Sequence, residues 1–177
     1  METKKITILG IGCTLLSDQG FGVSVIQALN EGFDFPEHVR LVDGGLVGVG
    51  LTGTLAQTDY LIVVDVITNN GHPGDIYRLE DRQIFERLTT RNHVQQVEFL
   101  EALAHCQALD HPSQTVLLGI EPGDTKTLAC ELTPVLQEKV APMTALVLKE
   151  LDRLAVTYRK REKNTHVSSH SIKNNQN

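Results

Sequence analysis

Five short runs of aliphatic and β-branched residues recur along the chain, and they constrain its fold more than any other feature. The clearest is DYLIVVDVI (59–67), and the others span 6–12, 38–45, 75–80 and 114–124. Nearly continuous apolar runs are typical of strands that a parallel sheet buries on both faces. The run DIYRLE (75–80) is more polar and alternating, which favours an edge strand.

Segments with helical periodicity separate most of these strands. We predict helices over 19–30, 47–57, 93–107 and 134–157. Ser17 and Asp18 are good caps for the first helix, and Pro142 predicts a kink or a break in the last. Strands that alternate with helices form βαβ units. The predicted fold is therefore α/β, a three-layer helix–sheet–helix sandwich around a mostly parallel, twisted sheet of about five strands.

Length and composition limit the domain organisation. Of the 177 residues, the segment 158–177 is polar and almost free of aromatic residues. Such a segment buries too little apolar surface to offset its ordering entropy. We therefore predict one domain over 1–157 and a disordered tail over 158–177.

Charge and cysteine content exclude several classes of protein. A net charge of −6 and the absence of tryptophan argue against a nucleic-acid-binding protein. No apolar stretch is long enough to span a membrane. The three cysteines are far apart and form no CxxC pair, which favours a reducing cytoplasm over a disulfide framework or a zinc knuckle.

Three polar residues follow predicted strands or begin predicted helices. They are Gln19, Asp65 and His93. Ligands of open α/β sheets bind beyond the carboxyl ends of the strands. An amide oxygen, a carboxylate and an imidazole that met there would make a small divalent-metal site. Each residue also has an ordinary interpretation, as a turn or solvated side chain, although a carboxylate after four aliphatic residues is costly without a partner.

A nucleotide site is the competing interpretation of the same region. Gly10-Ile11-Gly12 follows the first strand, and Asp43 ends the second, where a ribose-binding acid would stand. The third glycine of the dinucleotide motif is missing, because position 15 is leucine. Two glycines that ease a tight turn are the simpler explanation.

The motifs in order resemble those of the nickel–iron hydrogenase maturation endopeptidases. They are ILGIGCTLLSDQGFGV (8–23), LVDGGLVG (41–48), DYLIVVDVI, the helix after His93, LLGIEP (117–122) and LTP (132–134). The resemblance implies the helix–sheet–helix fold and a single cut near the C-terminus of the hydrogenase large-subunit precursor. It also implies that nickel arrives with this precursor and that the enzyme holds no resident cofactor.

The resemblance further implies roles for single residues. The metal-contacting trio of the family falls on Gln19, Asp65 and His93, with Asp65 and Asp43 as catalytic residues. Gln19 departs from the family, which has glutamate here. Glutamine keeps one oxygen ligand but has no charge and cannot act as a base.

We therefore expect a cytoplasmic endopeptidase that is a monomer when free, whose partner is the hydrogenase large-subunit precursor. Neither nucleic acid nor membrane is an expected partner. Because of Gln19, the alternative is a checkpoint protein that binds the precursor and cuts it poorly or not at all. A nucleotide-binding module is the third possibility.

Overall fold

The strands form one five-stranded sheet. The computed structural model describes residues 3–44, 50–88, 94–108 and 114–162. The strands lie in the order β3 (Val39–Gly44), β1 (Ile6–Ile11), β4 (Tyr60–Val66), β6 (Gln114–Ile120) and β5 (Ile76–Glu80). The first four are parallel, and β5 is an antiparallel edge strand. The predicted mostly parallel sheet and its edge strand are confirmed.

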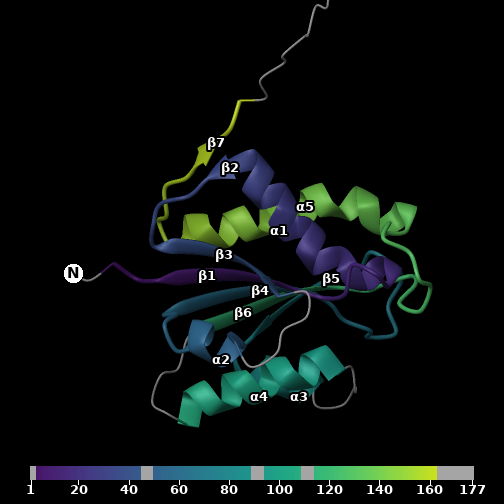
Figure 1. Cartoon of the computed structure of the whole chain (residues 1–177), viewed down its shortest axis with the longest axis horizontal. Helices are drawn as coiled ribbons and strands as arrows, with labels where there is room; N and C mark the ends of the chain where they lie inside the picture. Colours follow the sequence, from purple (N-terminus) through teal and green to yellow (C-terminus); the bar gives the residue numbers. More distant parts are fainter. Residues whose placement is uncertain (1–2, 45–49, 89–93, 109–113, 163–177) are drawn as a thin grey trace, which may run out of the picture.

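Helices cover both faces of this sheet (Figure 1). On one face lie α1 (Phe21–Gly32) and α5 (Pro134–Arg153). On the other lie α2 (Gly50–Leu55), α3 (Arg82–Leu88) and α4 (Val94–Ala108). The three-layer sandwich is therefore as predicted, and α3 is the one helix among these five that was not predicted.

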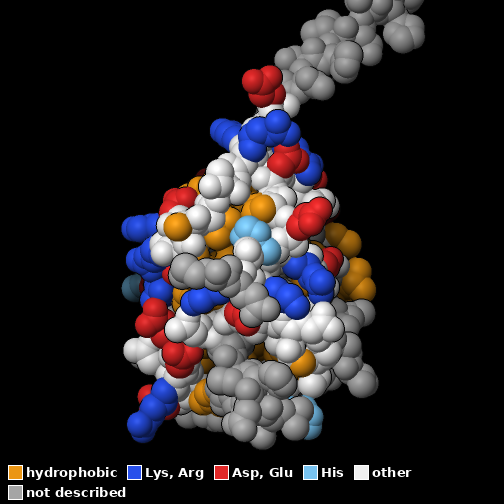
Figure 2. Space-filling view, turned by 90° about the vertical axis from the view of Figure 1, so that its left-hand side faces the viewer, with side chains coloured by type: hydrophobic (Ala, Val, Ile, Leu, Met, Phe, Trp, Pro, Cys, Tyr) orange, Lys and Arg blue, Asp and Glu red, His pale blue; other side chains and the backbone are white. Residues whose placement is uncertain are grey.

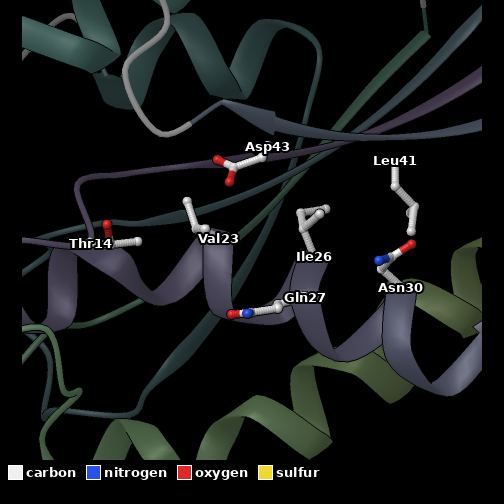
Figure 3. Close-up of a pocket in the computed structure, with 7 residues that line it drawn as sticks. All are labelled: Thr14, Val23, Ile26, Gln27, Asn30, Leu41 and Asp43. Carbon is white, nitrogen blue, oxygen red and sulfur yellow. The ribbon is translucent and has the colours of Figure 1, made fainter.

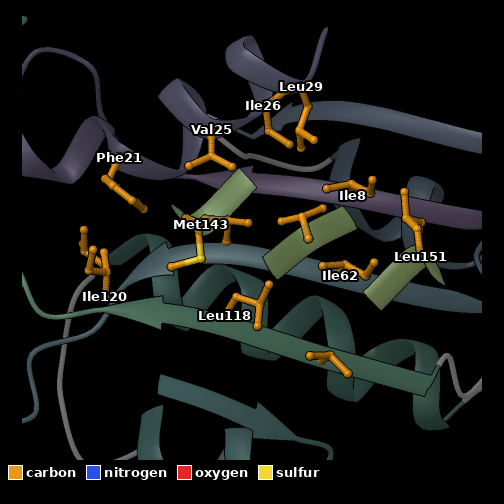
Figure 4. Close-up of a cluster of buried hydrophobic side chains, with 14 of the residues drawn as sticks. Ile8, Phe21, Val25, Ile26, Leu29, Ile62, Leu118, Ile120, Met143 and Leu151 are labelled. Atoms are coloured by element: carbon orange, nitrogen blue, oxygen red, sulfur yellow. The ribbon is translucent and has the colours of Figure 1, made fainter. Parts of the chain in front are cut away.

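The alternation of side chains along β4 explains why the sheet needs both layers. Ile62 and Val64 pack toward α1 and α5, together with Met143 (Figure 4). Leu61 and Val63 point the other way, into the cluster under α2 and α4. All four β4 residues have no exposed surface. Burial of each such side chain contributes about 1.5–3 kcal/mol before entropy is counted.

The tail was predicted to begin at residue 158, which is too early in the chain. β7 (Arg159–Lys160) pairs with β2 (Phe33–Asp34) in a two-stranded antiparallel ribbon. Tyr158 packs edge-on against Phe33, with ring centroids 5.8 Å apart. The domain therefore extends at least to Arg161, whose backbone N–H donates to the Gly32 carbonyl. The rest of the predicted tail, from residue 163, lies outside the described residues.

The amino ends of the strands present a mixed surface (Figure 2). Positive and negative side chains are interspersed there, and lysines and arginines gather around the β2–β7 ribbon. Nothing in this view singles out a site. Within the described ranges, no helix is long and apolar enough to cross a membrane.

The last helix is continuous, although Pro142 lies inside it. Of the two predicted outcomes, the break is therefore wrong, and the kink stays a prediction. Pro142 is exposed, so water can reach the Glu138 carbonyl that loses its helical donor. Thr133 and Pro134 start the helix as proposed, but the Thr133 side chain does not cap it.

Candidate functional site

The start of α1 sits directly on the carboxyl ends of the two central strands. Gly22 makes this contact possible. A Cβ atom at this position would lie closer than 3.0 Å to the carbonyl oxygens of Ile11 and Val64. The short 3-10 helix η1 (Ser17–Gly20), which precedes α1, is thereby held at the edge of the sheet where Asp65 follows Val64. This edge is the expected ligand-binding side of an open α/β sheet.

Gln19 lies within η1, and its side-chain amide is held on one side only. The Nε2 atom donates a 3.0 Å hydrogen bond to the Thr125 carbonyl. The Oε1 atom is buried and finds no hydrogen-bond partner among the described residues. A buried acceptor without a partner costs about 1–3 kcal/mol, so such an atom marks a place where a ligand can bind.

Asp18, next to Gln19, was predicted to cap the first helix, and this prediction is wrong. Its side chain is fully buried and binds the loop between β6 and α5. Oδ2 accepts hydrogen bonds from the backbone N–H groups of Gly123 and Asp124, each at 2.8 Å, and from the Thr133 hydroxyl at 3.1 Å. Oδ1 accepts from the Thr133 N–H at 2.8 Å. The hydroxyl of Thr133 is thus engaged by Asp18 rather than by the N-terminus of α5.

Backbone hydrogen bonds add to this connection. The Ser17 N–H donates to Ala129 at 2.8 Å, and the Ala129 N–H donates back to Leu15 at 3.2 Å. The loop 121–133 is therefore tied to η1 along its length, and Thr125 is held where it orients Gln19. This arrangement could not be predicted from local sequence patterns, because the partners are more than 100 residues apart.

Asp65 occupies the end of β4 as predicted, and only 3% of it is exposed. Since Val64 points toward α1, the alternation of the strand directs Asp65 to the face covered by α4. Its Oδ1 accepts a 2.7 Å hydrogen bond from the Val66 N–H. The helix α4 precedes the parallel strand β6, so its first residue, Val94, lies on the same side of the molecule as the strand ends.

The other two predicted residues differ in their placement. Asp43 is opposite Gly10 in the register of β3 and β1, in the same row as Val64. It therefore faces α1, on the other side of the sheet from Asp65. His93 lies outside the described residues. The structure thus brings Gln19 and Asp65 to one edge of the sheet but does not test the full trio.

Like Asp18, the buried carboxylate of Glu121 holds a loop, here the one that follows β4. Glu121 is 4% exposed, and its Oε2 accepts hydrogen bonds from the Tyr77 hydroxyl at 2.8 Å and the Asn69 N–H at 2.7 Å. Burial, together with the bond to Glu121, raises the pKa of Tyr77. Asp18 and Glu121 therefore fix two of the loops at the carboxyl edge of the sheet. Glu121 was not proposed from the sequence.

The glycines after β1 serve packing within the chain. A Cβ atom on Gly12, which has a φ of +138°, would overlap the carbonyl of Gln19, and one on Gly10 would overlap Gly22. The chain's own backbone therefore lies directly beside both glycines. This geometry favours the simpler explanation of the two glycines. Among the described residues, no three His, Cys, Asp or Glu side chains converge to hold a metal ion.

Comparison with known proteins places the chain in a family. The family model described as "Hydrogenase maturation protease" matches residues 23–150. The hydrogenase expression/formation protein HupD of Thiocapsa roseopersicina is 32% identical over 168 residues, which is 94% of this chain and 76% of the relative. The hydrogenase 2 maturation protease of Escherichia coli is 27% identical over 161 residues, 86% of this chain and 98% of that protein.

A solved structure agrees with the fold. The hydrogenase maturating endopeptidase HybD of Escherichia coli superposes with a TM-score of 0.84 at 28% identity, covering 89% of this chain and 98% of that one. The chain therefore belongs to the hydrogenase maturation protease family and is a peptidase. The resemblance seen in the sequence motifs is confirmed.

Proposed function

We propose that this member of the hydrogenase maturation protease family removes a C-terminal peptide from the large-subunit precursor of a nickel–iron hydrogenase. Nickel arrives as part of the substrate, and Gln19, Asp65 and His93 bind it. Bound there, the cation places the scissile peptide beside a Lewis acid. The free enzyme is a monomer and holds no metal or cofactor of its own.

The observation that carries this proposal is the buried Oε1 of Gln19, which has no hydrogen-bond partner in the part of the chain that the structure describes. The 3.0 Å bond from Nε2 to Thr125 fixes the amide so that its nitrogen is used and its oxygen remains for a ligand. An amide oxygen and a carboxylate are suitable donors for a divalent cation, and an imidazole favours nickel over magnesium. The residues present therefore fit the nickel of the substrate.

The same bond explains how glutamine can replace the glutamate of the family. A carboxylate at position 19 would place one negative oxygen where Nε2 now donates to the Thr125 carbonyl. Two acceptors at hydrogen-bond distance repel, so the site is built for an amide. We therefore infer that Gln19 is a working ligand and that Asp65 supplies the negative charge.

The surface beside Gln19 suits a protein substrate. Leu15 and Leu128 are 59% and 82% exposed, and each directly precedes a residue of the Leu16–Ala129 bridge. The two leucines are therefore neighbours on two loops that are tied together. Exposed apolar side chains next to a site favour contact with another protein. All three cysteines are free, which is consistent with the cytoplasm as the compartment.

The test is processing of purified precursor, with and without nickel, followed by mass spectrometry of the products. We expect cleavage only of the nickel-loaded form. Asp65→Asn and His93→Ala should each reduce the rate at least tenfold while circular dichroism shows a folded protein. Equal cleavage of nickel-free precursor would contradict metal-directed recognition. No cleavage of either form would contradict the proposal that this precursor is the substrate of the protease.

Gln19→Glu separates this proposal from the alternative of a non-cleaving checkpoint protein, which Gln19 itself motivates. If the amide is the working ligand, the glutamate variant should cleave no faster than twice the wild-type rate. A steep increase would show that glutamine impairs the enzyme and would support the checkpoint. A matched control is Gln137→Glu on α5, which is exposed and should not change the rate.

A further inference from the structure

A groove runs between α1 and the edge strand β3 (Figure 3). It has a volume of about 510 Å³. Leu41 and Asp43 point from β3 toward α1, and Val23 and Ile26 face them from the helix. The helix α1 packs tightly on β1, where a Cβ atom on Gly10 would overlap Gly22 and Ile26, and the groove lies beside this contact, between α1 and β3.

The lining of the groove combines apolar and amide groups. Gln27 and Asn30 are exposed and lie one helical turn apart on α1, at the rim of the groove. Neither side-chain amide makes a hydrogen bond to another described residue. An amide offers both a donor and an acceptor, which is what the main chain of an extended peptide requires.

The strand beside the groove has a free edge. β3 pairs with β1 on one side, and no described strand pairs with its other side. An edge strand presents N–H and C=O groups that can pair with an added strand. A peptide along β3 would direct alternate side chains toward Leu41 and Ile26 and pass within reach of Gln27 and Asn30.

The groove leads toward the candidate site. Thr14 lines its end, and a Cβ atom on Gly20 would lie 3.1 Å from the Thr14 Cα. Gly20 directly follows Gln19. A chain that leaves the groove at Thr14 therefore enters the edge of the sheet where Gln19 and Asp65 lie.

We propose that this groove binds the C-terminal segment of the hydrogenase precursor, in extended form, as an added strand beside β3. The proposal rests on the proposed function and names the surface that holds the substrate. Gln27 and Asn30 hydrogen-bond the main chain of the peptide, and one apolar side chain of the peptide packs on Val23, Ile26 and Leu41. The groove thereby holds the segment in register with Gln19 and contributes to substrate affinity rather than to the chemical step.

The test compares two tryptophan substitutions of exposed helical glutamines. Gln27→Trp fills the rim of the groove, and Gln137→Trp on α5 is the matched control. The substrate is the nickel-loaded large-subunit precursor from the same organism. We expect Gln27→Trp to raise KM at least fivefold with kcat within twofold of wild type, while Gln137→Trp changes neither. Asn30→Arg should repeat the KM effect if Gln27→Trp does not fold.

A crosslinking experiment reports the contact itself. A photoreactive benzoylphenylalanine at position 27 should crosslink to the C-terminal segment of the precursor, as mapped by mass spectrometry, and one at position 137 should not. Wild-type cleavage combined with an unchanged KM for both groove variants would overturn the groove and leave the proposed function standing. Failure of the wild type to cleave would overturn both.

Discussion

Neutralising Asp18 should loosen the loop that orients Gln19. In Asp18→Asn the side chain keeps its shape, but its NH₂ group must face a donor. In the best orientation the amide oxygen takes the place of Oδ2 and retains three hydrogen bonds. The fourth donor, the Thr133 N–H, then loses its acceptor and meets an N–H group.

The cost of this exchange follows from the hydrogen bonds. A buried N–H without an acceptor costs about 1–3 kcal/mol, and each of the three retained bonds weakens by about 1 kcal/mol when its acceptor loses the charge. The variant also avoids the cost of burying a charged carboxylate, and this gain offsets part of the sum. We expect a net loss of about 2–4 kcal/mol in the free energy of unfolding, a large fraction of a typical total of about 5–15 kcal/mol.

Urea unfolding followed by circular dichroism measures this loss. Glu138→Gln, which neutralises an exposed carboxylate on α5, is the control and should change the stability by less than about 0.5 kcal/mol. If Asp18→Asn were as stable as this control, the four hydrogen bonds to Asp18 could not be what holds the loop. Cleavage should also fall in Asp18→Asn, because Thr125 is part of the same loop.

Three further changes test the packing, the charges and the end of the domain. Gly22→Ala should lower the free energy of unfolding by about 1–3 kcal/mol through overpacking, whereas Gly32→Ala in the same helix, which meets no atom within 4 Å, should not. Hydrogen bonds from Arg78 hold the pKa of Glu150 below its ordinary 4.5. The ionised Glu150 therefore contributes its full stabilisation at pH values above its ordinary pKa, and this contribution is lost as the pH falls through the lowered pKa. The free energy of unfolding in urea should differ between Glu150→Gln and wild type at pH 7, and the two values should converge in acid. A chain that ends before Tyr158 should have a free energy of unfolding about 0.5–1.5 kcal/mol lower, because the aromatic contacts of Tyr158 are lost. Thermal unfolding of this chain and of the full chain measures the difference.

The local pattern of residues was sufficient to predict the layers of the fold. The apolar run through β4 could be buried only between two layers of helices, and the polar alternation of β5 indicated an edge strand. Thr133-Pro134 marked the start of α5. These features depend on neighbours within a few residues, which is why periodicity reveals them.

Long-range partners could not be read in the same way. Tyr158 and Arg161 belong to a polar, weakly patterned stretch, yet β2 gives them a partner more than 120 residues away. Pro142 stays within a helix because that position faces water. In both cases the surroundings, rather than the local sequence, decided the outcome.

The candidate site shows the same division. The sequence by itself was enough to propose Asp65, from a carboxylate after four aliphatic residues, and Gln19, from its glycine-rich setting, as site residues. Only the tertiary structure showed that Asp18 ties η1 to the loop 121–133 and that Asp43 faces away from Asp65. It also showed that the nitrogen of Gln19 donates to the Thr125 carbonyl, while its oxygen is buried without a partner among the described residues. Residue chemistry is local, but the direction in which a side chain points is set by partners that only the folded chain brings together.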